Sequence, residues 1–150
     1  EGPVTSEVLF GDSRPLHFEI GFGGGEHLAY RADLLPDHGF IGAEPFVNGV
    51  AQALVHIRDG SLANVRLHWG DALEVLQRIP GGEFRFGTDH AVYLRHALMV
   101  MQRHTASFEW LVQDRNTWEN RPSGWCETRY EHKARTVYGH EVWYFRYRRR

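Results

Sequence analysis

The chain has 150 residues, 42% of them hydrophobic and 13% aromatic, enough to bury one core but hardly two. We therefore expect a single domain over residues 1–150. No run of about 18 apolar residues occurs, and the first residues lack a basic stretch followed by an apolar one, so we expect neither a membrane span nor a secretory leader. The only cysteine, Cys126, cannot form a disulfide within the chain and is expected to be a structural thiol in a reducing cytoplasm.

Charge is distributed unevenly along the chain, although the net charge is only -2. Residues 1–114 hold 8 Lys/Arg and 15 Asp/Glu, whereas residues 115–150 hold 9 and 4. This asymmetry favours a surface that faces a polyanion beside an acidic pocket, although surface charge varies by as much in many domains. The histidines are scattered without the spacing of metal ligands, so no metal is expected.

Stretches rich in β-branched and aromatic residues predict six strands, at residues 16–20, 39–43, 65–69, 83–86, 108–112 and 142–147. Apolar residues at helical spacing predict helices over residues 46–58 and about 91–103. Strands that alternate with helices predict an α/β, Rossmann-like fold with a mostly parallel central sheet covered on both faces. The last two strands lack a long connecting helix, which predicts an antiparallel C-terminal edge. The arginines at 148–150 are expected to form a solvated tail.

Residues 16–28 run from a strand into a glycine-rich turn and then into a helix. The glycines Gly21, Gly23 and Gly25 follow the spacing G-x-G-x-G, and Glu26 occupies the position where a dinucleotide fingerprint requires glycine. Glu19 and Glu26 would repel a pyrophosphate but attract a sulfonium and an ammonium group. The loop therefore favours S-adenosylmethionine over NAD, with a tight turn that binds no ligand as the alternative.

Two further acids follow the next two predicted strands, at the same edge of the sheet as the glycine loop. Glu44 lies about 20 residues beyond the loop, where a carboxylate can accept hydrogen bonds from both ribose hydroxyls. Asp71 could border the adenine ring. A helix N-cap in front of Ala72 is an equally weighted interpretation of Asp71, and the two roles can coexist.

Five segments, in this order, resemble the bacterial tRNA (guanine-N7-)-methyltransferases: residues 19–25, 41–46, 70–72, 86–90 and 128–131. The combination is specific, because generic methyltransferases share the glycine loop but lack the Thr-Asp-His and Thr-Arg-Tyr-Glu elements. The resemblance implies a class I methyltransferase that transfers a methyl group from S-adenosylmethionine to N7 of a guanine in tRNA.

The resemblance also implies two sets of site residues. The cofactor side consists of Glu19, Gly21, Gly23, Gly25, Glu44, Asp71 and Ala72. The substrate side consists of Asp89, Thr128, Arg129, Tyr130 and Glu131.

The chemistry of the substrate suggests how some of these side chains would act. Carboxylates suit the N–H groups of guanine, so Asp89 and Glu131 are the candidates for the base, although a helix cap is the alternative for Asp89. The candidates for phosphate contacts are Arg129, Lys133, Arg121 and Arg135. The large aromatics Trp118, Trp125 and Tyr130 are expected to pack in the core rather than to stack on RNA bases.

The sequence departs from the family in one place. The family carries a Pro-Asp-Pro-Trp motif and a basic stretch between its third and fifth strands, whereas this chain passes directly from Pro80 to Gly81. We therefore expect a segment that includes a central strand to be missing there, and the catalytic residue is left unassigned. A protein that truly lacks this segment is not expected to fold normally, because its loss exposes strand edges and opens the core, and it is expected to be inactive.

Two other functions fit parts of the sequence. One is a methyltransferase of the same fold that acts on a small molecule or a protein, and the other is an inactive module that binds the cofactor. Methyl transfer to guanine N7 requires no base, because N7 carries a lone pair and no proton, so catalysis is expected to depend mainly on positioning. The expected partner is tRNA, with monomer and homodimer both left open.

Overall fold

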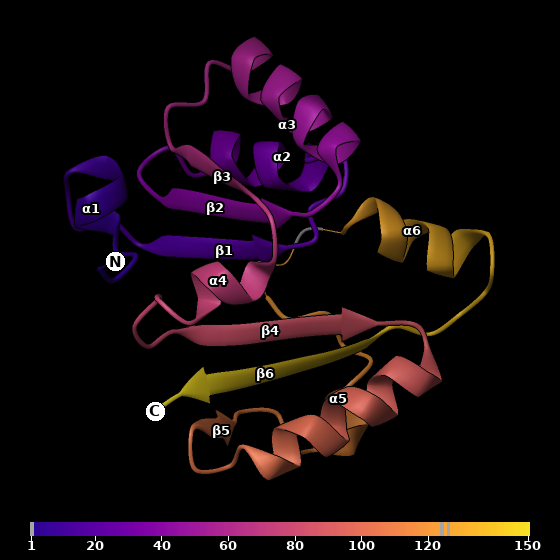
Figure 1. Cartoon of the computed structure of the whole chain (residues 1–150). Coiled ribbons are helices and arrows are strands. Elements are labelled where there is room, and N and C mark those ends of the chain that lie inside the picture. The colour runs from indigo at the N-terminus through magenta and orange to yellow at the C-terminus, as the bar shows by residue number, and fades with distance from the viewer. Residues whose placement is uncertain (1, 124, 126) are drawn as a thin grey trace. The chain divides into compact units, whose positions relative to one another are not determined.

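The structure is a computed structural model that describes residues 2–123, 125 and 127–150. Cys126, the expected structural thiol, lies outside the described residues. The chain divides into two compact units, Glu1–Pro80 and Gly81–Arg150, which are coloured indigo to magenta and rose to yellow in Figure 1. Their boundary coincides with the position of the expected missing segment, and a single domain over the whole chain stays a prediction.

The first unit is built around a parallel sheet of three strands in the order β1-β2-β3. Its strands are β1 (Leu16–Ile20), β2 (Gly39–Glu44) and β3 (Val65–Trp69), and its helices are α1 (Ser6–Phe10), α2 (Glu26–Leu34), α3 (Val47–Asp59) and α4 (Ala72–Leu76). All three predicted strands are confirmed, with β2 one residue longer than expected. Since the strands are parallel, their carboxyl ends meet at one edge of the sheet.

Both faces of this sheet are covered, and the central strand β2 is buried along its whole length. Phe40 packs on one side in a cluster with residues of α2 and α3, among them Leu28 and Ala53. Ile41, the next residue, packs on the opposite side with Val75 of α4. Figure 1 shows α2 and α3 together on one side of the strands and α4 on the other. Successive residues of a strand point to opposite faces, which is why a continuous apolar run suits a strand covered on both sides.

The second unit contains an antiparallel sheet in the order β4-β6-β5. Its elements are β4 (Glu83–Thr88), α5 (Ala91–Arg103), β5 (Phe108–Trp110), the 3-10 helix η1 (Arg115–Thr117), α6 (Arg129–Thr136) and β6 (Trp143–Arg149). The predicted antiparallel pairing at the C-terminus is confirmed. The six strands form two sheets of three, because β4 pairs with the C-terminal strand β6 and not with a strand of the first unit among the described residues.

Residues of β6 alternate between the two faces of the antiparallel sheet. One face is aromatic, and the other, the polar face, carries Arg146 and Arg148. Phe145 and Tyr147 face the same side as Phe86 and Phe84 of β4, with ring centroids 6.4 Å apart in each pair. The strand runs on through Arg149, whose backbone N–H donates to Gly82. The expectation of a tail is therefore wrong for residues 148 and 149, which belong to a paired strand, whereas the expected exposure to solvent is confirmed for Arg148 and Arg150.

Within the described part of the chain, we find no helix with the length and apolarity needed to cross a membrane.

Candidate functional site

The glycine loop at the end of β1 has a backbone that other residues rarely adopt. Gly21, Gly23 and Gly25 have φ angles of 67°, 58° and 81°, in the left-handed region that glycine enters without steric cost. A Cβ on Gly25 would come within 2.5 Å of the Ala53 Cβ in α3, whereas a Cβ on Gly21 or Gly23 would meet nothing within 4 Å. The loop is therefore tightly packed at the start of α2 and open around its first two glycines, where a ligand has room.

Glu44, at the carboxyl end of β2, holds this loop in place. One of its carboxylate oxygens accepts a hydrogen bond from the Gly23 N–H at 2.9 Å, and the other accepts one from the Phe46 N–H at 3.1 Å. The side chain is buried, so these bonds are well shielded from water. Each carboxylate oxygen has a second lone pair, so Glu44 can hold the loop and still accept a hydroxyl donor.

The other predicted cofactor residues lie around the same sheet edge. Glu19 of β1 is half-buried and pairs with Nδ1 of His27 at 2.8 Å. Asp71 caps α4 by accepting a hydrogen bond from the Leu73 N–H at 2.9 Å, directly before Ala72, the first residue of that helix. The N-cap interpretation of Asp71 is thus confirmed, and its contact with the adenine stays a prediction.

Three large apolar side chains at this edge were missed by the sequence analysis. Ile20 ends β1, Phe46 follows β2 and Trp69 ends β3, and they are 48%, 74% and 66% exposed. The Trp69 indole N–H donates to the Pro45 carbonyl at 3.0 Å, which restricts the orientation of its ring. Their signal in the sequence was position, because each stands at or just after the end of a predicted strand, where side chains meet a ligand in open α/β sheets.

In the second unit, Asp89 follows β4 directly and is held by two groups. Its Oδ2 lies 3.1 Å from Nδ1 of His140, and the Tyr130 hydroxyl interacts with its carboxylate and helps to lower its pKa. Burial raises the pKa of Asp89, but the hydrogen bonds from His140 and Tyr130 outweigh it and hold the pKa below its ordinary value. The side chain is only 8% exposed, and its Oδ1 is buried with no protein partner among the described residues.

The alternative interpretation of Asp89 as a helix cap is wrong. The N-cap of α5 is His90, whose side chain accepts from the Val92 N–H, while Thr88 accepts from the His90 N–H at 3.1 Å. Asp89 therefore has no role in starting α5. A buried acceptor without a partner is costly, so Asp89 is the better candidate for a substrate contact.

Thr128 and Glu131 form the start of α6. The Thr128 hydroxyl accepts from the Glu131 N–H at 3.1 Å, and Glu131 accepts in return from the Thr128 N–H, as in a capping box. Glu131 is also buried and accepts from Arg121 at 2.7 Å and from the Tyr144 hydroxyl. Burial and the contact with Glu131 raise the pKa of Tyr144. Thr128 and Glu131 thus stabilise the start of α6, and their contact with guanine stays a prediction.

The remaining predicted RNA contacts differ in how accessible they are. Tyr130, expected in the core, is 65% exposed, so that expectation is wrong. The packing of Trp118 and Trp125 is confirmed, because their rings lie edge-on against Phe145 and Tyr144 at 4.9 Å and 5.5 Å.

The cations expected at phosphates also make contacts within the protein. Arg121 pairs with Glu131 and Glu127, and Arg135 donates to the Tyr144 hydroxyl at 3.3 Å. The ammonium of Lys133 lies over the ring of Tyr138, and Arg129 is exposed at the first position of α6. All four cations are exposed, and their contacts with RNA phosphates stay predictions.

No group of three or more His, Cys, Asp or Glu side chains that could hold a metal ion occurs among the described residues.

Comparison with known proteins decides the family. A family model described as "Putative methyltransferase" matches residues 13–80. A tRNA (guanine-N(7)-)-methyltransferase from Erythrobacter litoralis is 60% identical over 190 residues, covering 100% of this chain and 82% of the relative. One from Novosphingobium aromaticivorans is 59% identical over 195 residues, with the same coverage. The chain belongs to the tRNA (guanine-N(7)-)-methyltransferase family.

Solved structures of other methyltransferases share the fold. An rRNA methylase from Streptococcus thermophilus matches with a TM-score of 0.56 and 11% identity, over 96% of this chain and 90% of its own. The aminoglycoside resistance methyltransferase NpmB1 matches with a TM-score of 0.57 and 15% identity, over 91% and 88%. The predicted Rossmann-like methyltransferase fold is thereby confirmed.

The methyl donor of this methyltransferase is S-adenosylmethionine. The first unit fits that cofactor on three counts: open space around Gly21 and Gly23, carboxylates at the carboxyl ends of β1 and β2, and exposed apolar rings beside them. Carboxylates accept the ammonium and hydroxyl donors of the cofactor, and a flat apolar surface suits its adenine.

Proposed function

We propose that this methyltransferase transfers a methyl group to N7 of a guanine in tRNA. The observation that carries the proposal is the identity of 60% over the whole chain with a relative named for that activity. A cytoplasmic location and a tRNA partner belong to the same proposal, and so does the absence of a metal requirement. Monomer and homodimer remain alternative states of assembly.

On the cofactor side, the proposal assigns the glycine loop and the acids around it. Glu44 accepts from the ribose, Glu19 attracts the ammonium group, and Asp71 with Ala72 borders the adenine. The loop glycines Gly21, Gly23 and Gly25 let the backbone approach the ligand closely. S-adenosylmethionine, when bound, supplies an electrophilic methyl group on its sulfonium.

On the substrate side, Asp89 is the residue proposed to hold the guanine. Its depressed pKa keeps it ionised at neutral pH, and its free Oδ1 can accept from N1–H or the exocyclic amine. Tyr130 and His140 orient the carboxylate, and Arg129 is proposed at the RNA backbone. N7 needs no deprotonation, so correct placement of the base can supply roughly 7–11 kcal/mol of the barrier reduction.

We also propose that a catalytic segment belongs between Pro80 and Gly81. The alignments with the relatives extend over 190 and 195 residues, more than the 150 of this chain, so the relatives have residues without a counterpart here. The boundary between the two compact units falls at the same place. The 17.4 kDa chain is therefore expected to bind the cofactor as it stands. Methyl transfer is expected only after such a segment has been restored.

The test is methyl transfer to unmodified bulk tRNA, with nucleoside analysis of the product and intact mass of the protein measured alongside. Two proteins are compared: this chain, and a chimera with the corresponding residues of the Erythrobacter relative inserted after Pro80. The chimera is expected to form 7-methylguanosine. In the chimera, Asp89→Asn should reduce kcat/KM about 10- to 100-fold, because the guanine loses a hydrogen bond to a charged group. Cofactor affinity should not change.

The other possible results separate the alternative functions. If the chimera binds the cofactor but methylates only a small molecule or a protein, the substrate belongs to that class and is not tRNA. A chimera that binds cofactor and methylates nothing would mean an inactive cofactor-binding module. If Asp89→Asn retains full activity, the proposed role of Asp89 is wrong.

A further inference from the structure

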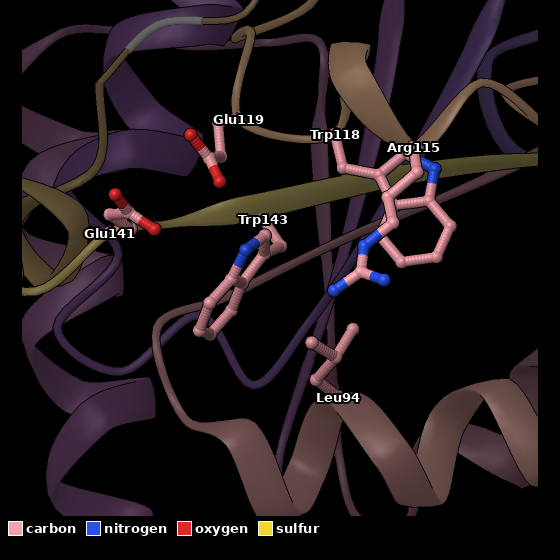
Figure 2. A pocket seen from close by; sticks show the side chains of 6 residues that line it. All are labelled: Leu94, Arg115, Trp118, Glu119, Glu141 and Trp143. Carbon is pink, nitrogen blue, oxygen red and sulfur yellow. The ribbon is translucent and has the colours of Figure 1, made fainter.

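A hollow of about 220 Å³ lies in the second unit, and neither the cofactor site nor the Asp89 cluster uses it. Figure 2 shows its six lining residues, Leu94, Arg115, Trp118, Glu119, Glu141 and Trp143. The volume lies below the roughly 300–1,000 Å³ of pockets that hold drug-sized ligands, so it suits a group the size of one nucleobase.

The walls of this hollow are fixed by secondary structure. Trp143 belongs to β6 and is paired with Thr88 of β4, and Leu94 belongs to α5. Trp118 packs against Phe145 at 4.9 Å, and its backbone carbonyl accepts from the Tyr144 N–H at 2.7 Å. A rigid wall binds a flat ring with little loss of conformational entropy.

The charged groups around the hollow are not used in the fold. Arg115, Glu119 and Glu141 are exposed, and none of their side chains has a hydrogen bond or ion pair within the described part of the chain. Other charged side chains of this unit, such as Glu83 and Glu131, are paired with arginines. Two carboxylates and one guanidinium without protein partners are thus directed at one hollow with indole walls.

The arrangement of these groups matches one base better than the others. In Figure 2 the two carboxylates lie on one side of the Trp143 ring, and the guanidinium of Arg115 lies on the other. Guanine has two adjacent donors, N1–H and the N2 amine, on one edge and two acceptors, O6 and N7, on another. Carboxylates accept from the first edge, and an arginine fork donates to the second. Adenine has only one donor group, which lies beside N7, so it fits this pattern poorly.

We propose that this hollow binds one guanine of the substrate RNA that is splayed out of its base stack and packs against Trp143, with Arg115 on its O6 and N7 and with Glu119 and Glu141 on its N–H groups. Aromatic side chains that stack on splayed bases are the common means of reading single-stranded RNA. This inference rests on the proposed function in so far as RNA is the substrate.

The guanine in this hollow is not the one that is methylated. Its N7 lone pair is engaged by Arg115, whereas the reacting N7 must be free to attack the methyl group. Glu141 directly follows His140, which contacts Asp89, and Trp143 is paired with Thr88, which precedes Asp89. The hollow therefore lies beside the proposed substrate site, where a nucleotide next to the target would lie.

The test is binding of mononucleotides to the full chain without S-adenosylmethionine, measured by NMR saturation transfer and tryptophan fluorescence. GMP is expected to bind at least about tenfold more tightly than AMP. Adenine lacks the matching donors and acceptors, so AMP would leave charged side chains of the hollow without a hydrogen-bond partner. 7-Methyl-GMP should bind more weakly than GMP, because the methyl group removes the N7 acceptor and adds positive charge facing Arg115.

Matched variants separate this pocket from general charge effects. The double variant Glu119→Gln, Glu141→Gln should weaken GMP binding about tenfold and leave AMP unchanged. Arg115→Gln should abolish the preference for GMP over 7-methyl-GMP. Glu109→Gln, which removes one charge from a carboxylate near Arg148 in the same unit, is the control and should change nothing.

Equal affinity for GMP and AMP, or the same loss in Glu109→Gln as in the double variant, would overturn the proposal. Tighter binding of 7-methyl-GMP would also overturn it and would make the hollow a site for the cationic product. This binding test does not depend on methyl transfer. If the base binds as predicted but the chimera does not methylate tRNA, only the proposed function is contradicted. Methylation without the predicted base preference would count against this pocket alone.

Discussion

The carboxylates of this methyltransferase have similar chemistry but different partners, and the partners decide their roles. Glu44 accepts from two backbone N–H groups and holds the glycine loop. Glu131 accepts from Arg121 and Tyr144 and holds α6. Asp89 is buried as well but keeps one oxygen without a protein partner among the described residues. A buried acceptor is costly unless it is satisfied, so the unsatisfied one is the candidate for a ligand.

All three acids are recognisable as site candidates in the sequence, but their roles cannot be ranked from it. Glu131 was expected at the guanine because it is a carboxylate within the segment 128–131 that resembles the family, and its structural partner Tyr144 is 13 residues away along the chain. A contact across that separation depends on how α6 packs on the sheet, which periodicity does not reveal.

Glu131→Ala tests the structural role at the residue scale. We expect it to lower the free energy of unfolding by about 1.5–3 kcal/mol, because it removes a buried acceptor of hydrogen bonds from Arg121 and Tyr144 and half of the capping box. Urea denaturation measures the change. Glu127→Ala is the control and should cost about 0–1 kcal/mol, since its pair with Arg121 is more exposed. Equal effects of the two variants would contradict the structural role of Glu131.

At the scale of elements, the glycine loop connects β1 to α2 in a conformation that depends on its glycines. The sequence predicted a turn at these positions from the spacing of glycines. The contact of Gly25 with Ala53 was not predictable, because it joins the start of α2 to the middle of α3.

Gly25→Ala and Gly21→Ala separate backbone strain from steric overlap. Both positions have positive φ, so each variant should lose about 1–2 kcal/mol of stability through strain. Gly25→Ala should lose a further 1–3 kcal/mol, roughly, because the new Cβ would meet Ala53. Thermal denaturation of both variants gives the comparison, and a Gly21→Ala variant as unstable as Gly25→Ala would contradict the close approach.

The ladder between β4 and β6 carries a charge cluster on its polar face. Glu83 accepts from Arg146 at 2.7 Å and from Arg85 at 2.8 Å, and these contacts lower its pKa from 4.5 to about 2. A carboxyl whose pKa is depressed in the folded state stabilises the protein above its unfolded pKa, and this contribution disappears as the pH falls through the folded value.

We therefore expect the second unit to lose about 1 kcal/mol between pH 4.5 and about 2 through Glu83, after allowance for solvent screening of the half-exposed arginines. The stability of Glu83→Gln should be lower at neutral pH and flatter across that range. The measurement is urea denaturation at a series of pH values. An unchanged slope in the variant would show that other carboxyls carry the acid sensitivity.

At the scale of the whole molecule, the basic C-terminal quarter is partly neutralised by the fold. Arg121 and Arg146 are paired with glutamates, and Arg135 donates to Tyr144. Fewer cations than the sequence count suggested are left to meet a polyanion. This reduction follows from tertiary pairing, since the glutamate paired with Arg146 is Glu83, 63 residues away along the chain.

Salt dependence tests the RNA substrate. If tRNA is bound through phosphates, the logarithm of the association constant should fall linearly with the logarithm of salt concentration, with a slope that reports the number of phosphates bound. Charge removal at the exposed Arg129 and Lys133 should reduce that slope by about 1 for each phosphate that is no longer neutralised. Filter binding over a salt series measures it. A slope near zero would favour a small-molecule substrate.

The sequence by itself determined the local elements and the cofactor chemistry of this protein. Strands β1 and β3 have the predicted bounds, the glycines form the predicted turn between β1 and α2, and Glu44 and Asp71 lie where their strands end. These features follow from residues within a few positions of one another, where backbone sterics and side-chain periodicity act directly.

Only the tertiary structure decided which strands pair and which charged groups lack a protein partner. The strand β4 pairs with β6 from the end of the chain, which gives two sheets of three strands where one was expected. The exposure of Trp69, the free oxygen of Asp89 and the charged groups around Trp143 arise in the same way. The physical reason is that burial and pairing depend on neighbours distant in the sequence, and their identity is set when the elements pack.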